Sequence, residues 1–121
     1  MDRRSKGATE ERLAERYLRR QGLKTIARNF TCRGGEIDLV CLHRDEIVFV
    51  EVRFRGPRSL VSSEESITPT KRRRIIKAAR YYLAQHSLYD KACRFDVLAI
   101  NQRSSFRRDI NWITHAFEAD S

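Results

Sequence analysis

The sequence has no apolar run long enough to cross a membrane, and its first ten residues, MDRRSKGATE, lack the apolar core of a signal peptide. It also has no lipidation signal and no amphipathic helix that sets large aromatic side chains opposite a basic face. Internal repeats and low-complexity tracts are missing too. These absences argue against membrane binding, and we expect the chain to be cytoplasmic.

Cysteine is scarce and poorly placed for a disulfide framework. Cys32, Cys41 and Cys93 are odd in number and widely spaced, with no C-x-x-C pair. The pattern therefore suggests neither a set of disulfides nor a zinc site. We expect reduced thiols, with Cys41 and Cys93 packed in strands as small hydrophobic side chains.

Positive charge, by contrast, is abundant. The 121 residues include 25 Lys and Arg against 16 Asp and Glu, which gives a formal net charge of +9. A chain of this length forms one domain with a real core. The excess positive charge indicates a polyanionic partner, of which nucleic acid is the commonest.

Periodicity and turn residues predict two helices and five strands in a single α/β domain. Helices are expected over residues 6–21, ended by Gly22, and over residues 69–86, opened by Thr68 and Pro69. Strands are expected over residues 23–30, 36–41, 47–55, 93–101 and 109–114. This order gives a mixed sheet with a helix on each face. Residues 56–67, rich in Ser, Gly and Pro, are expected to form a flexible loop.

Two adjacent strands carry acidic residues among apolar ones. Glu36 and Asp38 share one face of the first strand, and Glu51 lies on the next strand, where it can meet Asp38 if the register allows. A desolvated carboxylate must be protonated, paired with a cation or bound to a metal. The nearby Arg53 and Arg55 favour an internal salt-bridge network as one interpretation, and a divalent-metal site at Asp38 and Glu51 is the other.

The predicted second helix is strongly basic in its N-terminal half. Its six cationic residues surround much of the helix, so they cannot all touch one ligand; they are Lys71, Arg72, Arg73, Arg74, Lys77 and Arg80. A solvated charged face is the plain interpretation. Phosphate contact by two or three of them is the functional one, because clustered cations repel one another unless a polyanion neutralises them. Asp96, in the fourth strand, is expected either to pair with an arginine or to support the acidic site indirectly, through contact with its residues.

Four motifs resemble the YraN-type family, which is described as Holliday-junction-resolvase-like. They are GxxxExxAxxYL at 7–18, GGEIDL at 34–39, FVEVRFR at 49–55 and CRFDVLAI at 93–100. The match covers nearly the whole chain in order. That family is grouped with the restriction-endonuclease-like superfamily of PD-(D/E)xK nucleases, so the resemblance implies an αβββαβ core. It also implies a Mg²⁺- or Mn²⁺-dependent DNA endonuclease acting on branched or structured DNA, and a homodimer.

The resemblance assigns roles to individual residues. It implies that Asp38, Glu51 and Glu11 hold the metal. The superfamily's lysine, two residues after the second acid, is replaced here by Arg53, which keeps a positive charge near a phosphate but cannot act as a base. We expect DNA contacts from Arg55, Lys71, Arg72, Arg73 and Lys77. A nucleic-acid-binding module with this fold and no turnover is the alternative function.

Overall fold

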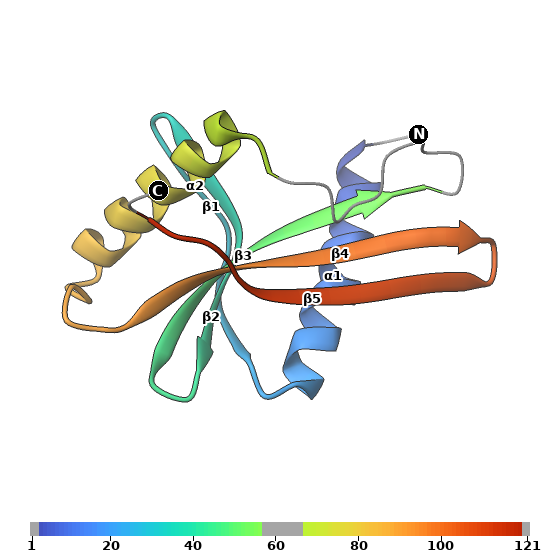
Figure 1. The fold of residues 1–121 in the computed structure, drawn as a ribbon, viewed down its shortest axis with the longest axis horizontal. Helices are drawn as coiled ribbons and strands as arrows, with labels where there is room; N and C mark the ends of the chain where they lie inside the picture. Colours follow the sequence, from blue (N-terminus) through green and yellow to red (C-terminus); the bar gives the residue numbers. More distant parts are fainter. Residues whose placement is uncertain (1–2, 57–66, 120–121) are drawn as a thin grey trace.

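The computed structural model describes residues 3–56 and 67–119 (Figure 1). Its elements, in chain order, are α1 (Arg3–Arg20), β1 (Lys24–Cys32), β2 (Gly35–His43), β3 (Glu46–Arg55), α2 (Pro69–Gln85), β4 (Cys93–Ser104) and β5 (Arg107–Phe117). The predicted single α/β domain with a five-stranded mixed sheet and two helices is confirmed. Most of the predicted flexible loop, at 57–66, lies outside the described residues.

The strands lie side by side in the order of the sequence, β1-β2-β3-β4-β5. All neighbouring pairs are antiparallel except β3 and β4, which are parallel and joined through α2. A parallel pair needs such a crossover because its strands run in the same direction. Within the described residues, no helix is both long and apolar enough to span a membrane.

The two helices cover opposite faces of this sheet (Figure 1). On β3, Phe49 points toward α2 and packs in one apolar cluster with Ile75 and Ala79. Its neighbour Val48 points the other way and packs with Ala14 and Leu18 of α1. Alternate residues of one strand therefore supply two separate cores, which explains why the run from Ile47 to Val50 is apolar throughout.

Two local predictions about helix ends are confirmed. Gly22 follows α1 with a φ of 97°, the left-handed conformation that favours glycine at a helix C-terminus. The side chain of Thr68 accepts a hydrogen bond of 3.1 Å from the backbone N–H of Lys71, with Pro69 as the first helical residue. This cap fixes Lys71 in the first turn of α2.

Two predictions about the C-terminal strands need correction. β4 and β5 form a longer hairpin than expected, because pairing continues through the polar residues beyond Asn101. The gap between the predicted strands 93–101 and 109–114 shortens to the turn between Ser104 and Arg107. The predicted packing of Cys93 is wrong, since it opens β4 and is exposed, whereas Cys41 is buried as predicted.

Gly35 lets α2 approach the start of β2 closely. A Cβ atom at this position would clash with the carbonyl oxygen of Arg74 and would lie 3.0 Å from the backbone nitrogen of Ala78. Both obstacles are helix backbone, so they cannot move aside as a flexible side chain would. The missing side chain therefore sets the distance between α2 and the acidic strand.

Gly35→Ala is expected to destabilise the protein by about 1–3 kcal/mol, because α2 must shift away from β2. The measurement is the free energy of unfolding in urea. Gly56→Ala is the matched control, since a Cβ at Gly56 would meet nothing within 4 Å. Equal stability of the two variants would contradict the close approach.

Candidate functional site

The two acidic strands separate at the point where their carboxylates lie. Pairing between β2 and β3 runs from His43 and Glu46 to Leu39 and Val50, and then ends. Asp38 and Glu51 are the next residues on the two strands. They thus occupy the opening between diverging strands, where side chains rather than ladder hydrogen bonds fill the space.

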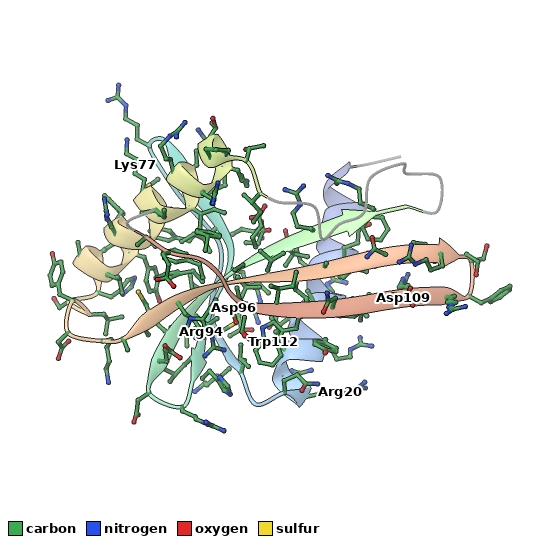
Figure 2. All side chains as sticks on the ribbon, in the orientation of Figure 1. Arg20, Lys77, Arg94, Asp96, Asp109 and Trp112 are labelled. Carbon is green, nitrogen blue, oxygen red and sulfur yellow. The ribbon has the colours of Figure 1, made fainter. Side chains whose placement is uncertain are left out.

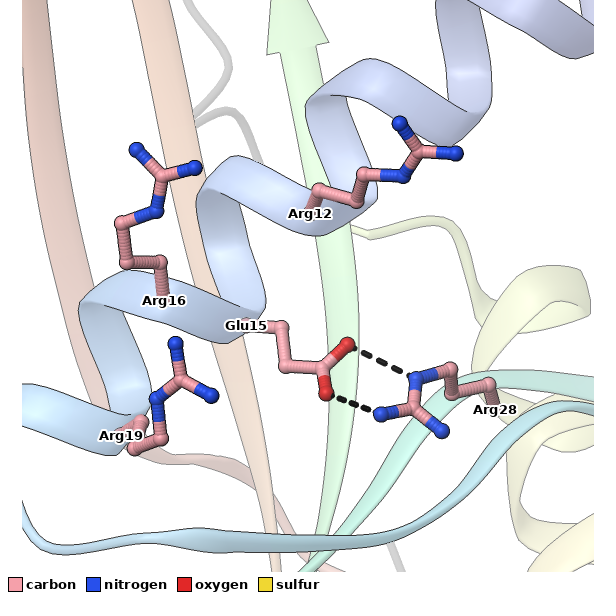
Figure 3. A pocket seen from close by; sticks show the side chains of 5 residues that line it. All are labelled: Arg12, Glu15, Arg16, Arg19 and Arg28. Carbon is pink, nitrogen blue, oxygen red and sulfur yellow. Dashed lines mark hydrogen bonds and ion pairs between the residues drawn. The ribbon is translucent and has the colours of Figure 1, made fainter.

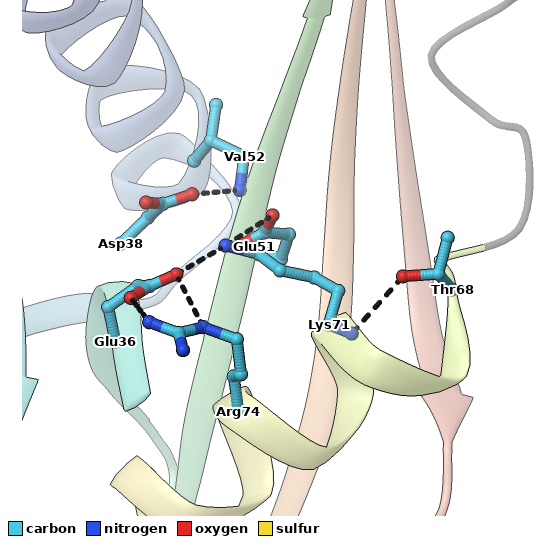
Figure 4. Close-up of polar contacts among 7 residues, drawn as sticks. All are labelled: Glu36, Asp38, Glu51, Val52, Thr68, Lys71 and Arg74. Carbon is cyan, nitrogen blue, oxygen red and sulfur yellow. Dashed lines mark hydrogen bonds and ion pairs between the residues drawn. The ribbon is translucent and has the colours of Figure 1, made fainter. Parts of the chain in front are cut away.

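Asp38 is held in place by the backbone of the neighbouring strand. Its Oδ2 atom accepts a hydrogen bond of 2.8 Å from the N–H of Val52 (Figure 4). This bond satisfies a strand donor that β2 no longer pairs. Burial raises the pKa of Asp38 above its usual value, and the Val52 bond offsets part of that rise.

Glu51 is the most perturbed acid of the site. Its side chain is 7% exposed, and its Oε1 atom has no hydrogen-bond partner in the described part of the chain. Burial, and next the charge of Asp38, raise the pKa of Glu51 to about 8, although the charge of Lys71 opposes the rise. At neutral pH this pair of carboxyls therefore keeps a proton that a bound cation would replace.

A cation from α2 lies against these acids (Figure 4). The Lys71 ammonium lies 2.9 Å from Glu36 Oε1 and 3.7 Å from Glu51 Oε2. Arg74 holds the other oxygen of Glu36 at 2.7 Å. Hydrogen bonds from Arg74 and Lys71 lower the pKa of Glu36 to about 2. Burial would lower the pKa of Lys71, but the bond to Glu36 and the charge of Glu51 raise it.

The salt-bridge interpretation is therefore correct for Glu36. It does not account for Glu51 and Asp38. Glu36 is fully engaged by two cations of α2, neither of which is Arg53 or Arg55. Glu51 has one distant cation and one orphaned oxygen. The metal-site interpretation of Asp38 and Glu51 stays a prediction.

Glu11 approaches the same cluster from α1. Its Oε2 atom accepts a hydrogen bond of 3.0 Å from the side chain of Asn29, a β1 residue with a left-handed φ of 49°. Burial raises the pKa of Glu11, the Asn29 bond opposes this, and the charge of Asp38 adds to it. Glu11 and Asp38 are therefore close enough to act on each other.

Arg53 and Arg55 follow Glu51 on β3 and are half-buried. The Nε atom of Arg53 is buried and has no hydrogen-bond partner among the described residues, while its charge lowers the pKa of Glu51. Arg55 donates a hydrogen bond of 3.0 Å to the carbonyl of Phe54. Arg53 is thus placed beside the acid pair, as its position in the motif predicts.

Of the remaining predicted DNA contacts on α2, Arg73 and Lys77 are exposed and form the outer cations of this helix; Lys77 is labelled in Figure 2. Arg72 is half-buried and lies three and four residues before the buried Ile75 and Ile76, so it is on the inner side of the helix. Arg73 donates a hydrogen bond of 3.2 Å to the hydroxyl of Thr70. Lys71 differs from these three because its ammonium is turned inward to the acids.

Asp96 lies on the opposite face of the sheet and does not join the site. Its oxygens accept hydrogen bonds from Arg94 Nε at 3.0 Å, Trp112 Nε1 at 2.9 Å and the backbone N–H of His115 at 3.1 Å (Figure 2). Arg94 also bonds Glu46 at 2.7 Å. Of the two expectations for Asp96, pairing with an arginine is confirmed, and the network joins β3, β4 and β5.

A metal ion needs several oxygen, nitrogen or sulfur ligands arranged around one point. Over residues 3–56 and 67–119, no group of three or more His, Cys, Asp and Glu side chains is arranged to hold a metal. Asp38 and Glu51 alone fit Mg²⁺, which keeps several waters and takes one or two carboxylates together with phosphate oxygens. The orphaned Oε1 of Glu51 supplies the free acceptor that such an ion requires.

Comparison with known proteins finds one family and many relatives. The model of "Uncharacterised protein family UPF0102" matches residues 10–100. A UPF0102 protein of Cupriavidus taiwanensis is 46% identical over 120 residues, covering 98% of this chain and 87% of the relative. One from Marinobacter nauticus is 41% identical, covering 94% and 93%, and one from Pseudomonas aeruginosa is 45% identical, covering 96% and 94%.

Proposed function

The chain belongs to the uncharacterised protein family UPF0102, as its YraN-type motifs predicted, and we propose that it is a divalent-metal-dependent endonuclease for branched or structured DNA. One observation carries the proposal. Glu51 is buried beside Asp38 with a strongly raised pKa and an oxygen that lacks a donor. Such burial costs folding free energy that the single ion pair with Lys71, at 3.7 Å, offsets only in part, and this is typical of a functional site.

Asp38 and Glu51 would hold Mg²⁺ or Mn²⁺. When bound, the ion would lower the pKa of a water and neutralise charge on the scissile phosphate. Asp38 is suited to this role because Val52 fixes the direction of its carboxylate. Glu51 is suited to it because its Oε1 atom has no hydrogen-bond partner among residues 3–56 and 67–119.

Three other side chains have roles that follow from their positions. Lys71 sets a compact ammonium 3.7 Å from Glu51, and we assign to it the phosphate-stabilising part that the superfamily gives to a lysine on the strand. Arg53, on that strand, adds a second positive charge that a phosphate can share. Glu11, with its raised pKa, would orient water from the α1 side.

The positive charge of the chain supports a DNA partner. The sequence contains no base-reading motif, which favours recognition of DNA shape over base sequence. A net charge of +9 and the outer cations of α2 favour contact with the phosphate backbone. Such contacts position a nucleic acid without reading its sequence. Recognition of DNA shape is therefore the proposed mode.

The rival function is a nucleic-acid-binding module that does not turn over. Arg53 favours it, because an arginine at this position cannot exchange a proton. Lys71 argues against it, since it brings a lysine to the same carboxylates from α2. The two functions differ only in cleavage.

The deciding experiment incubates the purified protein with four-way junction, flap and linear DNA in Mg²⁺, Mn²⁺ or Ca²⁺. Metal-dependent cleavage, with a preference for branched forms, is expected in Mg²⁺ or Mn²⁺. Binding without cleavage in every metal would favour the rival. Sedimentation of the protein with and without junction DNA tests the homodimer that the resemblance implies.

Arg72→Ala and Arg73→Ala are expected to weaken binding to every DNA form alike. Each should reduce the slope of log K against log salt by about 1, because one phosphate contact is lost. Fluorescence anisotropy over a salt series measures this. Lys91→Ala, an exposed cation beyond the end of α2, is the control and should leave the slope unchanged. A loss confined to one DNA sequence would contradict phosphate contact.

A further inference from the structure

A second basic surface lies on α1, away from the acid cluster. Arg12, Arg16 and Arg19 are spaced four and three residues apart, so they share one helix face. All three are exposed, whereas Ala14 and Leu18 of the same helix are buried against the sheet. The arginine row therefore faces solvent along the C-terminal half of α1.

This surface is hollowed rather than flat. The three arginines, Glu15 and Arg28 of β1 line a pocket of about 340 Å³ (Figure 3). We refer to these five residues as the α1 pocket. Arg28 reaches across it and holds both oxygens of Glu15, with Nε at 2.8 Å from Oε2. These bonds lower the pKa of Glu15.

The carboxylate of Glu15, the acid of the pocket, is therefore paired with Arg28. Arg12 and Arg16 make no hydrogen bond or ion pair among the residues whose side chains the structure describes. The pocket then carries four positive charges and one negative charge. Like charges spaced four residues apart on a helix destabilise it, so this arrangement favours a bound anion.

We infer that the α1 pocket binds phosphate groups of a nucleic-acid backbone, as a second grip separate from the outer cations of α2. Planar guanidinium groups match phosphate oxygens in pairs, which suits a phosphodiester better than a soft or apolar ligand. The choice of nucleic acid as the partner rests on the proposed function. Phosphate binding by the pocket does not require that the protein cleaves DNA.

The position of the pocket relates it to the acid cluster. Arg12 directly follows Glu11, whose side chain bonds Asn29 and acts on Asp38. The arginine row therefore begins one residue from the acids and continues along α1 away from them. Because α1 and α2 cover opposite faces of the sheet, DNA reaching from the acids along α1 uses phosphates that α2 does not contact.

The test compares two sets of variants with opposite expected signs, all in a Glu51→Gln background so that only binding is measured. Arg12→Gln with Arg16→Gln should weaken binding of a four-way junction about tenfold near 0.1 M salt and reduce the salt slope by about 2. Glu15→Gln should tighten binding, because it removes the only acid of the pocket and releases Arg28.

Each variant has a control with the same change in charge. Arg44→Gln with Lys91→Gln matches the double arginine variant, and Asp45→Asn matches Glu15→Gln; all three control residues are exposed. Thermal unfolding checks that every variant is folded. Binding by the pocket variants equal to that of their controls would overturn the pocket. Failure of the wild-type protein to cleave DNA would overturn the endonuclease and leave this result standing.

Discussion

Glu51→Gln is expected to reduce DNA cleavage at least about 10²-fold and, at the same time, to stabilise the metal-free protein at alkaline pH. The two effects have one cause. Glu51 is buried beside Asp38 and resists ionisation, which costs the folded state free energy whenever the carboxylate is charged. Glutamine keeps nearly the same shape and cannot ionise, so it removes both the proposed metal ligand and the free-energy cost of its charge.

The sign of the pH effect follows from the direction of the shift. The pKa of Glu51 is about 8 in the folded protein, above its usual value of 4.5. The protonated form therefore stabilises the fold fully below about pH 4.5, and this contribution is lost as pH rises to about 8. Wild-type protein should lose on the order of a few kcal/mol of stability across this window, and Glu51→Gln should lose much less.

Urea unfolding at about pH 5 and about pH 9, without metal, measures the difference. Added Mg²⁺ should raise the melting temperature of the wild type at the higher pH and leave Glu51→Gln unchanged. Asp45→Asn, an exposed acid in the turn of the same hairpin, should behave as wild type in both assays. A variant that is less stable than wild type at the higher pH would show that Glu51 is a structural ion pair.

The sheet could be predicted because its residues obey short periods. Alternation on β2 and the apolar run on β3 give strands by themselves, and Gly22, Thr68 and Pro69 mark helix ends through backbone conformation alone. The ends of β4 and β5 could not be predicted in this way. The polar ends of these strands are held by strand pairing and by the ion pair between Arg103 and Asp109. A local sequence pattern does not predict such contacts.

The site was predictable only in part, for a related reason. The proximity of Asp38 and Glu51 follows from their place in adjacent strands. The partner of Glu36 does not, because the sequence offers Arg53 and Arg55 close by while the structure uses Lys71 and Arg74 from 35 and 38 residues away. The signal that could have indicated it is the Thr68 cap, which fixes where α2 begins, combined with Gly35, which allows the helix close to β2.

Lys71→Met is expected to reduce cleavage about 10²-fold while leaving DNA affinity much closer to wild type than Arg72→Ala does. Its ammonium is turned to the acids at 2.9 Å from Glu36 and 3.7 Å from Glu51. In the proposed function it would therefore act on the reacting phosphate and not on the DNA backbone that the outer cations of α2 would contact. Lys91→Met, an exposed lysine beyond the end of α2, is the control and should retain full cleavage.

The pH profile of cleavage distinguishes a direct role of Lys71 from a purely structural one. The charge of Lys71 lowers the pKa of Glu51, so its removal should shift the rise of activity to higher pH. Lys71→Arg keeps a positive charge but not the compact ammonium, and should restore the wild-type pH profile with only part of the rate. If Lys71→Met cleaves like wild type and Arg53→Met does not, then the charge that matters lies on β3. In that case the motif position would be the functional one, and Lys71 would serve only to neutralise Glu36.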